Sequence, residues 1–291
     1  MAFTSVKQLL ATAKEQNLPL WEIILDEDVK DRGTGREDSL RQMNALWSAM
    51  KSAGVSYRAE ARSKSGLVGG DGGKMEEYAK TGNGIVSGFF SEVIAQALQM
   101  GECNACMKRI VAAPTAGSCG VLPAVLIPFA KANKIEDRQI ISALFVAAGF
   151  GQIIASRASI SGAEGGCQAE IGSASAMAAA AVVSLKGGTP EMCANACAMA
   201  LMNLLGLVCD PVAGLVEIPC VKRNVVGAVN AISCADMSLA GIGSAIPPDE
   251  VIDAMREVGD MMPAALKETG TGGLAATPAG ITAAKRIHGN I

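Results

Sequence analysis

The chain has 291 residues and a mass of 29.7 kDa, enough to bury a large core in one domain or in two closely joined domains. Hydrophobic residues make up 50% of the chain but aromatic residues only 3%, so the core must consist of aliphatic and small side chains. The net charge of −3 and the scarcity of aromatic rings argue against a nucleic-acid-binding surface, which needs basic groups and stacking platforms.

Cysteine usage and the N-terminal residues indicate the compartment. Nine cysteines in a chain of this length do not form the dense pattern of a small, disulfide-bonded secreted domain. The segment up to Gln16 carries Lys7, Lys14 and Glu15 and lacks the apolar stretch of a signal peptide. We therefore expect a reducing, cytoplasmic environment.

Two uncharged runs, residues 139–156 and 192–209, raise the question of a membrane, because the mean hydropathy of the chain is +0.31. Both runs are only just long enough to span a bilayer, contain amide side chains and lack tryptophan or tyrosine at their ends. We expect both runs to lie in buried core helices, with no membrane involved.

In chain order, residues 1–60 show apolar side chains at the spacing of amphipathic helices, as at Val6, Leu9 and Ala13. We expect this segment to be helical and more peripheral than the rest. From residue 63 to residue 84 the periodicity stops and glycine dominates, which predicts a long functional loop. Further helices are predicted over residues 88–108, 121–131, 137–156, 173–185, from 190 onward, 219–240 and 248–261, with loops at 112–120 and 159–166 between them.

Strand signals are scarce, because few segments alternate with the two-residue period of a sheet. Helix-start signals are clear, as at Thr189, Pro190 and Glu191, which supply a cap, a first-turn proline and a first-turn acid. The predicted fold class is all-α: a single helical domain over residues 1–291. Its long buried helices are joined by glycine-rich loops, and these loops hold the polar groups from which an active site could form.

Three cysteines, Cys167, Cys209 and Cys220, each lie beside glycine or proline, at what we predict to be the mouths of helices. Their wide spacing means that only the fold could bring them together. A buried inert thiol is the alternative at each position, but helix ends favour thiolates, and thiolates suit zinc or iron–sulfur clusters. Three thiolates can hold three irons of a cubane cluster and leave the fourth iron open as a Lewis acid.

The motifs around these cysteines are long and specific. They read SISGAEGGCQAEIGSAS over residues 159–175 and GLVCDPVAGLVEIPCVKRN over residues 206–224. Shorter motifs are APTAG at 113–117, GLVGGD at 66–71 and ETGTGGLAATP at 268–278. With these motifs the chain closely resembles the alpha chain of iron–sulfur-dependent L-serine dehydratase, and the resemblance covers nearly the whole chain.

The resemblance implies an all-helical catalytic part and an oxygen-sensitive [4Fe–4S] cluster held by Cys167, Cys209 and Cys220. It implies an L-serine ammonia-lyase in which the open iron binds the substrate hydroxyl and carboxylate, a base removes the Cα proton and hydroxide leaves. The resulting aminoacrylate tautomerises to an imine that hydrolyses to pyruvate and ammonia. The resemblance also implies a separate beta chain as the partner, which is fused to the alpha part in some relatives and is expected to contribute to the base or to access.

The glycine-rich loops are the expected substrate cradle, because their N–H groups and hydroxyls can bind a carboxylate. A glycine turn without a ligand is the alternative at each position, and the run at 66–74 lacks the spacing of a P-loop. The candidate substrate-binding residues are Ser65, Gly66, Gly69, Gly70, Lys74, Thr115, Ser161 and Gly162. Of the six other cysteines, only Cys119 is a candidate neighbour of the pocket.

The general base is not identified by any motif. The only histidine, His288, is near the C-terminus and is expected on the surface, while Lys64 and Asp71 are weak candidates. Some single-chain relatives carry a further cysteine near their C-terminus, but residues 284–291 contain none. We therefore expect water, substrate or another group at the fourth iron.

Other functions stay open at this point. The same cluster chemistry could remove sulfide from L-cysteine. A pyridoxal-phosphate dehydratase with Lys64 or Lys74 as the Schiff base is a second alternative, and a purely structural or membrane helical protein is a third.

Overall fold

The structure, a computed structural model, describes residues 3–86 and 88–289. Within these ranges the regular elements are helices, and the single β contact is an isolated bridge between Cys209 and Lys267. The all-α prediction is therefore confirmed. The helices are α1 (Val6–Gln16), α2 (Leu20–Arg32), α3 (Arg36–Val55), α4 (Asp71–Lys80), α5 (Phe89–Ala105), α6 (Val121–Asn133), α7 (Asp137–Arg157), α8 (Gly162–Gly165), α9 (Ser173–Leu185), α10 (Pro190–Met202), α11 (Cys220–Leu239), α12 (Pro248–Met261) and α13 (Pro278–His288). A π-helical turn, η1 (Gln168–Gly172), precedes α9, and 3₁₀ turns lie at Val212–Gly214, Ala264–Leu266 and Gly273–Ala276.

Local sequence signals account for many of these boundaries. The hydroxyls of Ser5, Thr189 and Thr277 cap α1, α10 and α13, and each accepts a hydrogen bond from a first-turn N–H. Glu136 and Gln139 form a reciprocal capping box at the start of α7. The predicted helices at 173–185 and 248–261 match α9 and α12 at both ends.

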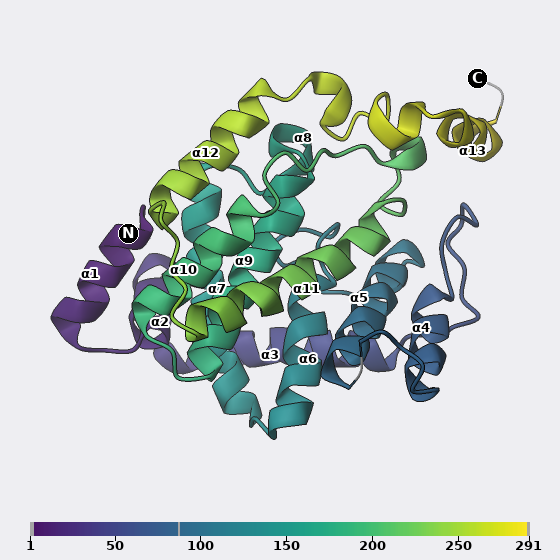
Figure 1. Ribbon diagram of the computed structural model, residues 1–291. Coiled ribbons are helices and arrows are strands. Elements are labelled where there is room, and N and C mark those ends of the chain that lie inside the picture. The colour runs from purple at the N-terminus through teal and green to yellow at the C-terminus, as the bar shows by residue number, and fades with distance from the viewer. Residues whose placement is uncertain (1–2, 87, 290–291) are drawn as a thin grey trace.

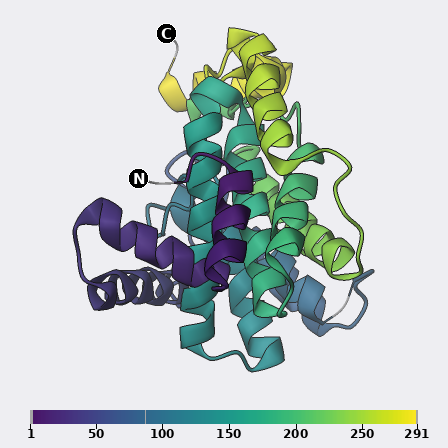
Figure 2. The same ribbon diagram turned by 90° about the vertical axis from the view of Figure 1, so that its left-hand side faces the viewer.

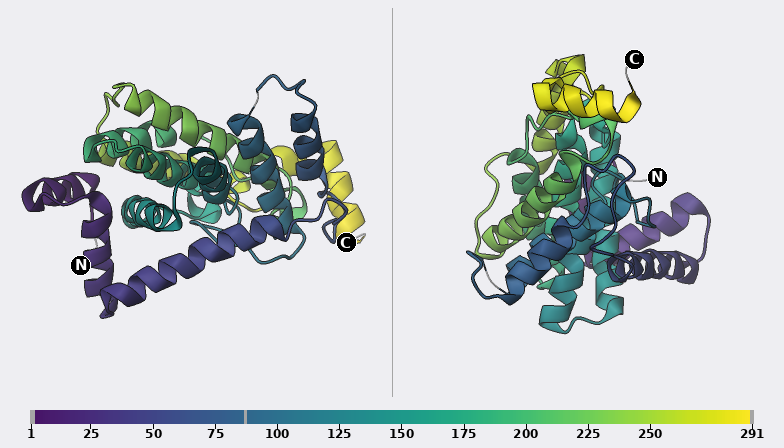
Figure 3. Two further views of the ribbon diagram at one scale, coloured as in Figure 1. Left: turned by 90° about the horizontal axis from the view of Figure 1, so that it is seen from below. Right: turned by 90° about the vertical axis from the view of Figure 1, so that its right-hand side faces the viewer.

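Helix α9 is the centre of the molecule. It is rich in alanine, is buried over Ser173–Val183, and is packed against α6, α7, α10 and α11 (Figure 1). Because its side chains are small, the surrounding helices approach its backbone closely. Helices α1 and α2 lie at one side of this bundle (Figure 2), and α3 runs along it in the view from below (Figure 3, left). Val6, Leu9 and Trp47 belong to the same hydrophobic cluster as α9. The more peripheral character of residues 1–60 stays a prediction.

Helix α7 is the one helix of the described residues that is long and apolar enough to cross a membrane. Of its most apolar window, 61% is buried in the protein, and it packs against α2, α3 and α9. The second apolar run, residues 192–209, is not one helix, because α10 ends at Met202 and turns follow. Both runs thus contribute to the core, α7 as a helix throughout.

The loop predicted over residues 63–84 is wrong in its second half, where α4 begins at Asp71. The buried carboxylate of Glu102 on α5 accepts hydrogen bonds from the N–H groups of Asp71 (2.7 Å) and Gly72 (3.2 Å) and so caps this helix. A Cβ atom on Gly72 would lie 2.6 Å from Cγ of Gln99. Gly72 thus serves close packing rather than a turn, which composition alone does not reveal.

Close packing of α7 on α2 generates a first prediction. A Cβ atom on Gly149 would lie 2.4 Å from Cδ1 and 2.7 Å from Cγ1 of Ile24, so Gly149→Leu must displace a buried side chain. We expect a loss of about 1–3 kcal/mol in the free energy of unfolding, measured by urea denaturation. Ala148→Leu, on the exposed side of the same helix, is the matched control and should change it by less than about 0.5 kcal/mol. Equal effects of the two substitutions would contradict this packing.

Candidate functional site

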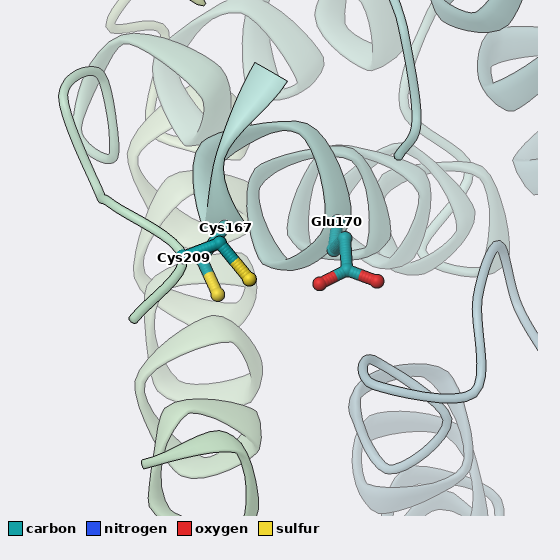
Figure 4. Close-up of side chains that lie close together, drawn as sticks. All are labelled: Cys167, Glu170 and Cys209. Atoms are coloured by element: carbon teal, nitrogen blue, oxygen red, sulfur yellow. The ribbon is translucent and has the colours of Figure 1, made fainter. Parts of the chain in front are cut away.

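Two cysteines and a glutamate converge at one end of the bundle. The Sγ atoms of Cys167 and Cys209 and a carboxylate oxygen of Glu170 all lie within 4.8 Å of one another, and all three residues are buried. Figure 4 shows the three side chains pointing into the same space. Cys167 directly precedes the π-helical turn η1, and Glu170 lies within that turn. Single π-turns are frequent at functional sites because they re-aim side chains.

The side chain of Gln168 holds the Cys167 corner in place. Its amide nitrogen donates to the carbonyl of Met255 (2.9 Å), and its amide oxygen accepts from the N–H of Gly206 (2.9 Å). The backbone N–H of Gln168 donates to Leu207 (2.9 Å). Cys167 is thereby tied to α12 and to the segment that leads to Cys209.

Cys209 is not at the mouth of a helix, so that part of the prediction is wrong. It lies in an extended segment whose backbone N–H donates to Leu266 (2.8 Å) and whose carbonyl accepts from Glu268 (2.8 Å). Asp210 and Pro211 follow, and the next regular element is only the short 3₁₀ turn at Val212–Gly214. The segment at 266–268 therefore supplies hydrogen bonds in place of a helix.

Cys220 is the first residue of α11 and is 6% exposed. Its sulfur is not among the three groups within 4.8 Å, yet negative charge at Cys167 raises its pKa, after the larger effect of burial. Asn224, one turn later, donates to the carbonyls of Cys220 (2.9 Å) and Gly117 (2.8 Å) and accepts from the N–H of Gly120 (2.8 Å). This buried amide fastens the loop at 112–120 to the start of α11.

The two converging thiols are not equivalent. The Cys209 thiol donates a hydrogen bond to Cys167 and lowers the pKa of Cys167 in spite of burial, aided by the nearby Arg223 guanidinium. The same hydrogen bond, followed by burial, raises the pKa of Cys209. For Glu170, burial raises the pKa of the carboxyl, against the hydrogen bond from Thr115. The site thus stabilises one thiolate beside one thiol.

Of the predicted substrate residues, Thr115 and Gly162 border this site. The Thr115 hydroxyl donates to Oε1 of Glu170 (2.7 Å). A Cβ atom on Gly162 would lie 2.9 Å from both Cys209 Sγ and Glu170 Oε2, so a larger residue would fill the space between them. The Ser161 hydroxyl instead caps the short helix α8 by accepting from the N–H of Ala163 (3.3 Å).

The loop at 63–70 forms a second polar cluster. The hydroxyls of Ser63 (2.9 Å) and Ser65 donate to the buried carboxylate of Glu217. Gly66, Gly69 and Gly70 all have positive φ, and a Cβ atom on Gly69 would lie 2.3 Å from a backbone oxygen. This loop packs beside Cys220, because Val68 shares a small apolar cluster with Leu98 and Val221.

The remaining candidates face outward. Lys64 is exposed at a cavity of about 570 Å³ that Ser65, Glu217 and Arg286 also line. Lys74 is exposed and pairs with Asp71 (3.0 Å), which also pairs with Lys222 (3.3 Å). The pKa of Asp71 is lowered, and the largest cause is its hydrogen bond with Lys74. The ion pairs of Asp71 with Lys74 and Lys222 lie at the surface rather than at the thiol site.

His288 is exposed, as predicted, and lies 3.0 Å from the carbonyl of Ala213. Asn290 and Ile291, the last two residues of the cysteine-free tail, lie outside the described residues.

Cys119 is buried, its thiol donates to the carbonyl of Met100 (3.8 Å), and burial raises its pKa to about 12. Cys119 is therefore a thiol of the core.

Sequence reasoning missed Glu170, Asn224 and Arg223 as parts of the site. Each lies three or four residues after one of the cysteines, inside the motifs quoted above. The available signal was a polar or charged side chain in a glycine-rich, otherwise apolar stretch. Such a side chain must find a partner when it is buried.

Comparison with known proteins agrees with the motifs. The profile of the family described as serine dehydratase alpha chain matches residues 15–275. The chain belongs to this family.

Its relatives include the probable L-serine dehydratase alpha chain of Bacillus subtilis (strain 168), 48% identical over 99% of this chain and 96% of the relative. The L-serine dehydratase alpha chain of Peptoniphilus asaccharolyticus is 40% identical over 95% of both chains. The L-serine dehydratase TdcG of Escherichia coli (strain K12) is 45% identical over 62% of this chain but only 40% of its own length. The predicted family and the prediction of a lyase are confirmed.

The buried amide of Asn224 generates a prediction for this member of the serine dehydratase alpha chain family. Asn224→Ala leaves the N–H of Gly120 and the carbonyl of Gly117 without their partner. Because each unpaired buried group costs about 1–3 kcal/mol, we expect a total loss of about 2–4 kcal/mol in the free energy of unfolding by urea. Asn133→Ala, at the exposed end of α6, should cost less than about 0.5 kcal/mol. If Asn224→Ala keeps the native free energy of unfolding, the loop at 112–120 is not held in place by this amide.

Proposed function

We propose that this chain is the alpha chain of an L-serine ammonia-lyase, which converts L-serine to pyruvate and ammonia together with a separate beta chain. The family match over residues 15–275 supports the reaction. Two relatives that this chain covers almost completely are named alpha chains, which supports a separate partner. The longer Escherichia coli relative, of which this chain covers 40%, supports a remaining part of the enzyme on another chain.

We further propose that Cys167, Cys209 and Cys220 hold a [4Fe–4S] cluster. The observation that carries this proposal is the convergence of two buried thiols, one stabilised as a thiolate, around a space that Gly162 leaves open. Thiolates are the donors that such clusters require. When bound, the cluster would supply a Lewis-acidic iron that withdraws charge from the departing hydroxide. The nine cysteines are all free in the structure, in keeping with a cytoplasmic enzyme.

A single metal ion, bound at this same place instead of a cluster, is the alternative that one observation favours. The group within 4.8 Å contains the carboxylate of Glu170 but not Cys220, and two thiolates with a carboxylate could hold a single zinc ion. The two possibilities make opposite demands on the chain. A cluster needs Cys220 and not Glu170, whereas the single ion needs Glu170 and not Cys220.

The Glu170 carboxylate is placed to bind substrate in the proposed enzyme. Its Oε1 accepts from Thr115, while among the described residues Oε2 has no hydrogen-bond donor and faces Gly162 and Cys209. A Cβ atom on Gly117 would lie 3.2 Å from both oxygens, so this glycine keeps the other side of the carboxylate clear. We propose that Oε2 accepts a hydrogen bond from the ammonium group of L-serine and orients it.

Removal of the Cα proton needs a base, for which Lys64 and Asp71 were candidates. Lys64 is exposed at the Glu217 cluster, and Asp71 is held by Lys74 and Lys222. We therefore propose that the beta chain contributes to proton removal. The loops at 63–70 and 112–120 then serve to bind and orient the substrate rather than to move its proton.

Metal content tests the proposed cofactor. After anaerobic purification and reconstitution, we expect about four iron and four sulfide per native chain, since that is the composition of the proposed cluster. Cys167→Ala and Cys220→Ala should lose both, whereas Glu170→Gln should keep both. Cys193→Ala, which removes a buried thiol of the core helix α10, is the matched control and should keep both.

Zinc without sulfide, lost in Glu170→Gln but kept in Cys220→Ala, would establish the single-ion site instead. Negligible metal in the native chain after reconstitution would overturn both versions. Pyruvate formation from L-serine, compared with sulfide release from L-cysteine in the same preparation with the beta chain, separates the two lyase reactions.

Substrate binding by Glu170 has its own test. With the beta chain present, Glu170→Gln should raise KM for L-serine about tenfold or more, because a hydrogen bond to a charged group is worth about 1.5–3 kcal/mol. Glu164→Gln, in the same loop region but exposed, should leave KM unchanged. An unchanged KM for Glu170→Gln, at native iron content, would remove Glu170 from the substrate site.

A further inference from the structure

Arg223 reaches the thiol site from the third residue after Cys220. One guanidinium nitrogen, Nη1, donates to the carbonyl of Val208 (2.7 Å) and to Sγ of Cys167 (3.3 Å). Only 13% of the Arg223 side chain is exposed. A single side chain of α11 thus contacts the Cys167 sulfur and the backbone directly before Cys209.

Asp210 holds the other end of the guanidinium. Its Oδ1 lies 2.8 Å from Nη2 of Arg223 in a buried ion pair. Its Oδ2 accepts from the N–H of Leu274 (2.8 Å). A Cβ atom on Gly273, whose φ is +55°, would lie 2.4 Å from Oδ2, so glycine is required for this approach. The motif at 268–278 is thereby connected to the cysteine site through Asp210.

The contacts of the two terminal nitrogens distinguish two roles for Arg223. If it served only to neutralise the buried Asp210, both terminal nitrogens would be directed at that carboxylate, because buried ion pairs depend on good hydrogen-bond geometry. Instead only Nη2 faces Asp210, while Nη1 donates to Val208 and Cys167. Hydrogen bonds and charge at the sulfur ligands are what a protein uses to tune an iron–sulfur cluster.

We propose that Arg223 is a positioning residue that orients Cys167 and sets the electrostatic potential at the cluster, and that Asp210 fixes Arg223 for this purpose. This inference rests on the proposed cluster. It adds the consequence that the segment at 268–274, which contains no cysteine, controls the cluster through Asp210.

The test uses the reconstituted complex with the beta chain and two readouts other than activity. Arg223→Met removes a positive charge near the sulfur, so the reduced cluster is less stable. We expect the equilibrium constant for one-electron reduction to fall about tenfold, which is about 59 mV in midpoint potential. Iron release to a chelator should become about 10- to 100-fold faster, as is typical for loss of a contact to a metal ligand.

Arg223→Lys keeps the charge but cannot reproduce the fixed geometry of the guanidinium. It should therefore shift the potential less than Arg223→Met while still accelerating iron release. Arg256→Met removes an exposed arginine of α12 that donates to the carbonyl of Arg157 and should leave both readouts unchanged.

If Arg223→Met has the native melting temperature, the native midpoint potential and the native rate of iron release, this inference is overturned. The proposed cluster itself is then unaffected. If Arg223→Met does not fold, native iron release in Arg223→Lys would overturn it equally. Absence of any cluster from the native chain is a different result and refutes the proposed cofactor itself.

Discussion

Irregular backbone can be buried only where other groups supply the hydrogen bonds that a helix would otherwise make, and this constraint governs the functional end of the molecule. Glycine-rich segments enter the bundle here, and each meets one buried polar side chain. Gln168 serves the Cys167 corner, Asn224 the loop at 112–120, Glu217 the loop at 63–70 and Glu102 the start of α4. These polar residues come from helices or directly flank them, so the rigid bundle holds the loops.

The small-residue core explains why these segments can converge at all. Helix α9 consists mostly of alanine and serine, and Gly227 of α11 lies where a Cβ would be 2.9 Å from side chains of both Ile171 and Val121. Helices with so few large side chains approach one another closely. Cys167, which precedes η1 and α9, and Cys220, at the start of α11, interact electrostatically although they are 53 positions apart in sequence.

Helix positions were predictable from the sequence because their signals are local. Capping residues, first-turn prolines and apolar periodicity all act within a few residues, and α9 and α12 were predicted at both ends. The start of α4 was missed because its cap, Glu102, lies on another helix. The three cysteines were found through motifs, but Glu170 and Arg223 acquire their roles only from contacts across the fold. A sequence shows that a buried charge must have a partner, and only the structure shows which partner.

The charges around the thiols show how one site can separate two chemical tasks. On one side, Arg223 and the Cys209 thiol stabilise a thiolate at Cys167, the state that a metal ligand needs. On the other side, burial favours the protonated form of Glu170, while Thr115 occupies only one of its oxygens. In the proposed enzyme, metal binding would therefore fall to the thiols and substrate orientation to Glu170, around the same small space. Gly162 and Gly117 keep that space open, because a Cβ on Gly162 would lie 2.9 Å from both the Cys209 thiol and the carboxylate, and one on Gly117 3.2 Å from the carboxylate.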